Sequence, residues 1–261
     1  MANLKKLQSA VAGAEFDALL LMDDKNIYYA TDFMPQDSAA LITADRAFVI
    51  TDSRYIEAAE KECAAGVECV LTTREKPLLA TLSEITGKLG VKSLGAEEEY
   101  LSYGLYRRVE EKLGISLAPA QGVVTALRQR KTAEELENLI AAQRIAEKAL
   151  EEVLPLIKPG VSERAIAAEL TYRMQLHGGE GNSFDPIVVA GAKGSMPHGV
   201  PGDELIREGD FVTMDFGCIK RGYCSDMTRT VAVGSVTDEM KNVYDTVLRA
   251  QLAGIAAAKP G

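Results

Sequence analysis

Two aspartates lie in a segment that the sequence predicts to be a β-hairpin. The stretch VTMDFGCIKRGYCSDMTRTVAV, residues 212–233, consists of two apolar, β-prone runs on either side of a turn at residues 220–222. A hairpin centred between residues 220 and 221 sets Asp215 directly opposite Asp226, with Cβ atoms about 5 Å apart. Facing like charges destabilise a sheet, so this pair needs a physical reason.

The face of the hairpin that carries the two aspartates is polar. In the same register Thr213 lies opposite Thr228, so hydroxyl groups flank the carboxylates. Alternation along the first strand places its apolar residues on the other face, which we expect to face a core: Val212, Met214 and Phe216. A carboxylate pair can share a proton, form ion pairs with cations such as nearby Arg221 or Arg229, or bind a divalent metal ion.

The N-terminal part of the chain, residues 1–128, is predicted to be an α/β domain. Apolar residues at helical spacing alternate there with short apolar runs that are typical of buried strands. This order favours a mixed sheet with helices packed against it. Helices are expected over residues 3–13, 54–65, 77–90 and 102–114, and strands within 16–23, 38–55, 67–73 and 91–98.

A basic, polar stretch at residues 128–131 marks the end of this domain, and residues 129–261 form a second one. Long amphipathic helices replace the short alternating elements, which indicates a different architecture. The expected elements are a helix over 133–157 with a capping box at Thr132 and Glu135, a helix over 163–176 capped by Ser162, strands around 184–190, the loop GAKGSMPHG at 191–199, and the hairpin.

The segment after the hairpin weakly repeats the start of the second domain. Thr237 opens a helix as Thr132 does, and both helices end at Lys-Pro-Gly. An internal repeat would explain this likeness, and so would two ordinary Pro-Gly helix stops. If the repeat is real, its second copy has barely begun, and part of the apolar face of the hairpin is expected to lack a cover.

Composition excludes two classes of partner. The chain has 261 residues, of which 47% are hydrophobic and 26% charged, with a net charge of −9. Since no basic stripe appears, we expect no nucleic acid, and since no apolar run approaches the ~18 residues of a membrane span, we expect no membrane. The four cysteines form no CxxC pair and are interpreted as reduced thiols of a cytoplasmic protein: Cys63, Cys69, Cys218 and Cys224.

The motifs of the second domain resemble those of the pita-bread metallopeptidases, which include Xaa-Pro aminopeptidases, prolidases and methionine aminopeptidases, with creatinase as a metal-free relative. The resemblance rests on MDFG and CSDMTRT in the hairpin and on MPHG upstream, and NIYYATDF and TDSRYIEAA resemble the N-terminal domain of the Xaa-Pro branch. It implies an α/β N-terminal domain like that of creatinase, with a mixed sheet, followed by the first half of an α+β pita-bread catalytic domain.

The resemblance also implies a site. The family binds two divalent metal ions through two Asp, one His and two Glu, and carried over residue by residue it makes Asp215 and Asp226 the metal ligands, with Mn²⁺ first and Co²⁺ or Zn²⁺ possible. His198 matches the histidine that lies beside the substrate and stabilises developing charge. His177, next to two glycines, is interpreted as a helix cap. Neither histidine matches the metal ligand, so the chain looks cut short within the catalytic domain and inactive without residues beyond Gly261.

The implied activity is metal-dependent hydrolysis of the bond between an N-terminal residue and proline, in longer peptides or in Xaa-Pro dipeptides. The expected partners are short peptides with proline in second position and a second copy of the chain in a homodimer. A non-catalytic binding protein or inactive fragment on the same fold is the alternative. A methionine aminopeptidase is disfavoured by the N-terminal domain, and a creatinase-type amidinohydrolase by the two aspartates.

Overall fold

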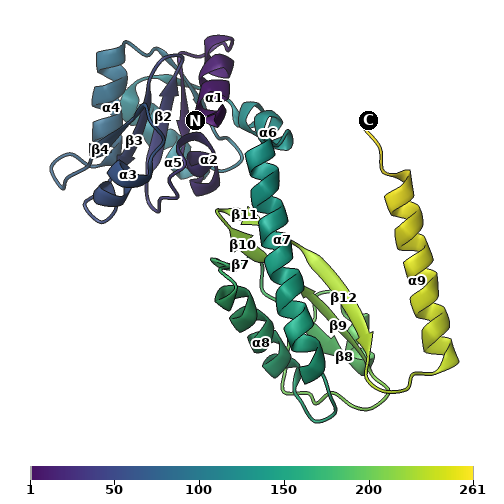
Figure 1. The fold of residues 1–261 in the computed structure, drawn as a ribbon. Helices are drawn as coiled ribbons and strands as arrows, with labels where there is room; N and C mark the ends of the chain where they lie inside the picture. Colours follow the sequence, from purple (N-terminus) through teal and green to yellow (C-terminus); the bar gives the residue numbers. More distant parts are fainter. Residues whose placement is uncertain (1, 261) are drawn as a thin grey trace. The chain divides into compact units, whose positions relative to one another are not determined.

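The structure is a computed structural model, and it describes residues 2–260 (Figure 1). Its contacts divide the chain into two compact units that meet between Lys131 and Thr132. We call them the N unit and the C unit and describe each by itself. Helix α6 (Gln121–Gln129) runs past residue 128, so a cut there falls within its last turn.

The N unit is built on one mixed sheet of six strands in the order β4-β3-β2-β1-β5-β6. The strands are β1 (Ala18–Leu21), β2 (Ala39–Thr43), β3 (Ala47–Thr51), β4 (Val67–Leu71), β5 (Ser93–Ala96) and β6 (Ser116–Pro119). The β1–β2 and β2–β3 pairs are antiparallel, and the other three pairs are parallel. The predicted mixed sheet is confirmed, and the sequence patterns did not predict the strand β6 or the helices α2 and α6.

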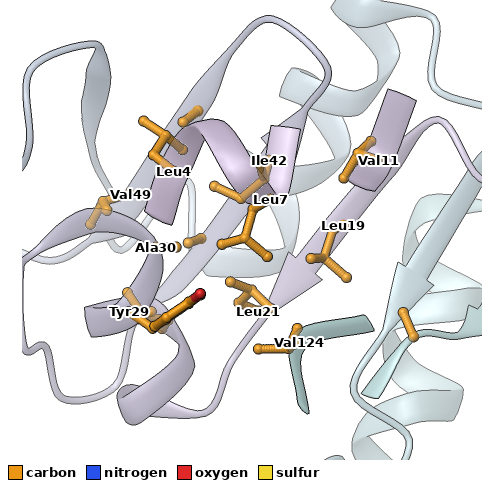
Figure 2. Close-up of a cluster of buried hydrophobic side chains, with 14 of the residues drawn as sticks. Leu4, Leu7, Val11, Leu19, Leu21, Tyr29, Ala30, Ile42, Val49 and Val124 are labelled. Carbon is orange, nitrogen blue, oxygen red and sulfur yellow. The ribbon is translucent and has the colours of Figure 1, made fainter. Parts of the chain in front are cut away.

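Helices cover both faces of this sheet because its central strands are apolar throughout. Leu19 and Leu21 of β1 pack into one cluster with Leu4, Leu7 and Val11 (Figure 2), whereas Ala18 and Leu20 belong to a second. The helices of the first face are α1 (Ala2–Ala12), α2 (Asp24–Thr31), α3 (Ile56–Glu62) and α6 (Gln121–Gln129). Those of the second are α4 (Leu78–Leu89) and α5 (Tyr103–Leu113).

The C unit begins with two helices, α7 (Ala133–Val153) and α8 (Glu163–Leu176). The predicted capping box is confirmed, since Thr132 and Glu135 bond each other's backbone N–H groups, and Ser162 caps α8 by accepting from the backbone N–H of Ala165. Helix α7 ends earlier than predicted. A 3₁₀ turn, η1 (Leu154–Leu156), replaces its last turn because Pro155 has no backbone N–H to continue the helix.

Two three-stranded sheets follow, in the orders β12-β9-β8 and β11-β10-β7. Their strands are β7 (Gly181–Asn182), β8 (Ile187–Ala190), β9 (Phe211–Phe216), β10 (Cys218–Lys220), β11 (Tyr223–Cys224) and β12 (Met227–Ala232). The first sheet lays one face on α7 and α8, and the apolar residues of that face are buried: Val188, Val212, Met214 and Phe216. The expectation that part of this face lacks a cover is therefore wrong.

Helix α9 (Asp238–Ala257), which Thr237 caps as predicted, carries a set of exposed apolar residues. Tyr244 stacks at a tilt on Phe211, with ring centroids 6.0 Å apart. The exposed apolar residues of α9 are Val243, Tyr244, Val247, Leu248, Leu252 and Ile255. Within residues 2–260, every helix is too short or too polar to cross a membrane.

Candidate metal and catalytic site

The hairpin forms as predicted, but its register differs by two residues. Asp215 pairs with Thr228, so it does not lie directly opposite Asp226. The cause is the turn, which is centred between Arg221 and Gly222, with φ of 48° and 72°. Two successive residues with positive φ are the pattern of a type I′ turn, whose twist suits a two-residue hairpin loop. The predicted centre, between residues 220 and 221, is wrong by one residue.

The two aspartates nevertheless stay on one side of the hairpin. Asp226 precedes Thr228 by two residues, and both are exposed while Met227 between them is buried, so their side chains point to the same face. The pair is therefore diagonal, and diagonal neighbours across antiparallel strands stand about 7–8 Å apart at Cα, with their side chains closer. This offset relieves part of the repulsion expected for facing carboxylates.

A close approach of two backbones sets the position of Asp226. A Cβ atom at Gly217 would lie 1.9 Å from the carbonyl oxygen of Ser225, so only glycine fits between β9 and β10. The hydroxyl of Ser183 donates to that carbonyl at 2.6 Å, and Ser225 Oγ accepts from the backbone N–H of Cys218 at 3.0 Å. These residues were missed from sequence, although a glycine inside a strand was a signal of such an approach.

Hydroxyl groups line the aspartate face, as predicted, but with changed partners. Thr228 Oγ1 donates to Asp215 Oδ1 at 2.9 Å, and Thr213 and Thr230 share a hydrogen bond of 3.0 Å. The predicted Thr213–Thr228 pair is wrong for the same reason as the aspartate pair. The Thr228 hydroxyl fixes one oxygen of Asp215 and leaves the other for a ligand.

Neither aspartate forms an ion pair with a lysine or arginine in residues 2–260. Arg229 alternates to the α7 side of the sheet, where its guanidinium donates to the carbonyl oxygen of Thr228 at 2.8 Å. Hydrogen bonds from Arg144 and Gln143, with a smaller contribution from the charge of Arg229, lower the pKa of Glu147 on α7. The charge of Arg229 therefore acts on Glu147 of α7 and not on the aspartate pair.

The segment that carries His198 folds over the same face of the sheet. Val189 pairs with Thr213 across β8 and β9, so its side chain lies on the aspartate face. Gly199 is buried against it, and a Cβ atom there would lie 2.6 Å from Val189 Cγ1. His198 itself is exposed. The structure thus brings the segment of His198 and the two aspartates to one face.

His177 lies elsewhere, at the C-cap of α8, as predicted. Its Nε2 is 2.9 Å from Glu152 Oε1 on α7. Burial raises the pKa of Glu152, but the hydrogen bonds and charges of His177 and Arg173 outweigh burial and lower it. His177 thus joins the two helices on the far side of the sheet from Asp215.

The donor set fits a divalent metal ion only in part. Asp215 and Asp226 supply carboxylate oxygens, the donors that Mn²⁺ and Mg²⁺ prefer. Across residues 2–260, however, no three His, Cys, Asp or Glu side chains gather closely enough to hold an ion. Two carboxylates are fewer ligands than a divalent ion takes, so by themselves they can supply only part of a metal site.

Comparisons with known proteins identify relatives of this chain. A Bacillus subtilis protein named Uncharacterized peptidase YqhT is 39% identical over 260 residues, which are 99% of this chain and 73% of that protein. The Xaa-Pro dipeptidase of Pyrococcus horikoshii is 32% identical over 262 residues, 99% of this chain and 72% of that enzyme. The solved structure of a Xaa-Pro dipeptidase from Bacillus anthracis matches with a TM-score of 0.92 at 39% identity, covering all of this chain and 73% of that chain.

Family models cover both units. Residues 3–130 match the Creatinase/Prolidase N-terminal domain, and residues 137–261 match metallopeptidase family M24. The predicted architecture, a creatinase-like N-terminal domain followed by part of a pita-bread catalytic domain, is thereby confirmed. The chain belongs to metallopeptidase family M24.

Proposed function

We propose that this chain carries part of the active site of a dinuclear metallopeptidase that cleaves after an N-terminal residue followed by proline. The observation that carries the proposal is the juxtaposition of Asp215, Asp226 and the segment of His198 on one face of the β12-β9-β8 sheet. The relationship to Xaa-Pro dipeptidases supports the choice of substrate. Short peptides with proline in second position are the proposed substrates.

Asp215 and Asp226 would hold the metal, two divalent ions in the family, with Mn²⁺ first and Co²⁺ or Zn²⁺ as alternatives. When bound, the ions lower the pKa of a water molecule and polarise the amide carbonyl. Thr228 orients Asp215 through its 2.9 Å hydrogen bond, so that one carboxylate oxygen keeps a fixed direction. Ser183 and Gly217 do the same for the backbone beside Asp226.

His198 would act on the substrate and not on the metal. Its exposed imidazole can donate a hydrogen bond to the scissile amide as negative charge develops there, which is the kind of stabilisation that speeds acyl transfer. The homodimer remains a prediction, which light scattering of the purified protein tests.

The decisive experiment uses the protein expressed from its complete coding frame, stripped of metal and reloaded with Mn²⁺. We expect hydrolysis of Ala-Pro or of Ala-Pro-Ala, and little of the matched peptides Ala-Ala and Ala-Ala-Ala. Asp226→Asn should abolish it, whereas Asp238→Asn, which changes an aspartate with 95% of its side chain exposed, should not. Equal cleavage with and without proline would contradict the proposed specificity.

The 261-residue chain alone is expected to bind metal weakly and to hydrolyse neither peptide, because residues 2–260 bring no three candidate ligand side chains together, whereas the family uses five ligands. Robust turnover by this chain, lost in Asp226→Asn, would show that the ligand count is wrong.

A further inference from the structure

Glu163, the first residue of α8, has no exposed side-chain surface. Its Oε1 accepts from the backbone N–H of Ala190 at 2.8 Å. Its Oε2 accepts from Lys193 Nζ at 2.6 Å and from the backbone N–H of Gly202 at 3.0 Å. A buried carboxylate is stable only when such donors compensate its lost hydration.

These three donors bracket one segment. Ala190 is the last residue of β8, Lys193 lies in the 3₁₀ turn η2 (Gly191–Ser195), and Gly202 closes the stretch that contains His198. We call residues 191–202 the His198 loop. One carboxylate thus holds the entry, the first turn and the exit of this loop.

The helix cap does not explain this arrangement. An acidic residue in the first turn of a helix is often there for the helix dipole. Here Ser162 already accepts from the backbone N–H of Ala165, and the carboxylate of Glu163 turns away to the loop. Backbone bonds reinforce the same contact, since Arg164 N–H donates to Gly202 O at 2.9 Å.

The ammonium of Lys193 completes the anchor. It bonds the buried Glu163 and, at 3.2 Å, the exposed Glu204. The hydrogen bond that Lys193 donates to Glu163 raises the pKa of Lys193, so this side chain stays charged. The two carboxylates differ in burial and in their partners, since only Glu163 also accepts from backbone N–H groups at both ends of the loop.

We propose that Glu163 is a positioning residue that holds the His198 loop over the aspartate face and so fixes where His198 meets the substrate. The catalytic part of this inference rests on the proposed function. Its physical part, the anchoring of the loop, does not.

The test uses the Mn²⁺-loaded protein from the complete coding frame and the isosteric variant Glu163→Gln. The amide NH₂ group of the glutamine in this variant cannot accept the hydrogen bonds that Lys193 and Gly202 donate to Glu163. We expect amide hydrogen exchange in residues 191–202 to accelerate at least about tenfold, as for one lost charge-assisted hydrogen bond. The matched control Glu204→Gln, 61% exposed and also bonded to Lys193, should leave exchange near wild type.

Measurements of kcat distinguish a positioning role of Glu163 from a general loss of stability. Glu163→Gln should lower kcat by up to about 10²-fold, the cost of a small misplacement of a catalytic group, with metal content unchanged. In a His198→Ala background, Glu163→Gln should have no further effect on kcat, because it acts through His198. Additive losses would overturn the positioning role.

The two hypotheses fail in different ways. Wild-type turnover of His198→Ala would refute the role of His198 and with it the catalytic part of this inference, while the exchange data would still decide the anchoring. Unchanged exchange in Glu163→Gln would overturn the anchor even if His198 is essential. If Glu163→Gln does not fold, Lys193→Gln replaces it, with the same directions and smaller effects, since it removes one donor of three.

Discussion

The two units use their sheets in different ways. In the N unit the strands β1, β2 and β3 are buried at every residue, and helices cover both faces. In the C unit β9 alternates, with Val212, Met214 and Phe216 buried while Thr213 and Asp215 are partly exposed. A sheet that helices cover on both faces has no face left to bind a ligand, whereas a sheet covered on a single face can present polar residues on the other.

Two buried glutamates extend this comparison. Glu97 in the N unit accepts from the backbone N–H groups of Met22 and Asp23 and from Asn26 Nδ2, and these contacts join β5 to the start of α2. Glu163 in the C unit makes the same kind of contacts but to the His198 loop. A buried carboxylate that accepts from backbone N–H groups joins β5 to α2 in the N unit. In our proposal, the same kind of contact orients a catalytic residue in the C unit.

The largest expected effect is a difference in stability between substitutions at two neighbouring residues of β9, one on each face of the sheet. Met214→Ala removes a fully buried side chain and should lower the free energy of unfolding by about 2–5 kcal/mol. Thr213→Ala, on the aspartate face, loses only a hydrogen bond to Thr230 and should cost about 1 kcal/mol. Urea denaturation measures both. Equal losses would mean that the two faces do not differ as described.

His198→Ala should show the opposite pattern. We expect kcat to fall about 10²-fold, as for the loss of one hydrogen bond to developing charge. Unfolding free energy and Mn²⁺ content should stay at wild-type values, because His198 is exposed and is not proposed as a ligand. Loss of metal from this variant would instead make His198 a ligand and contradict its proposed role.

A smaller effect is expected from pH on the N unit. Burial raises the pKa of Glu97, although hydrogen bonds from Met22, Asp23 and Asn26 oppose it. A carboxyl with a raised folded pKa contributes stability below its unfolded pKa of about 4.3 and loses it as pH rises through the folded value. The unfolding free energy of wild type relative to Glu97→Gln should therefore fall over that range. A relative stability that rises with pH would contradict this sign.

The sequence predicted the alternation of β9 because its period of two is local, and it predicted the capping of α7, α8 and α9 for the same reason. The register of the hairpin could not be predicted because it depends on which two residues adopt positive φ. Arg221 is an unusual residue at such a position. The role of Glu163 escaped because its donors lie 27 to 39 residues away. The first turn of a helix is by itself a sufficient local reason for an acidic residue.

The most direct test of the account is to locate the metal. Crystals of the protein from its complete coding frame, grown with Mn²⁺, should show anomalous scattering peaks within bonding distance of the carboxylates of both Asp215 and Asp226. Crystals of the Asp226→Asn variant, grown in the same way, should lack at least one of these peaks. Manganese bound away from this face, for example beside Asp24 and Asp37 in the N unit, with none at Asp215 or Asp226, would contradict the claim that the open face of the β12-β9-β8 sheet is the active site.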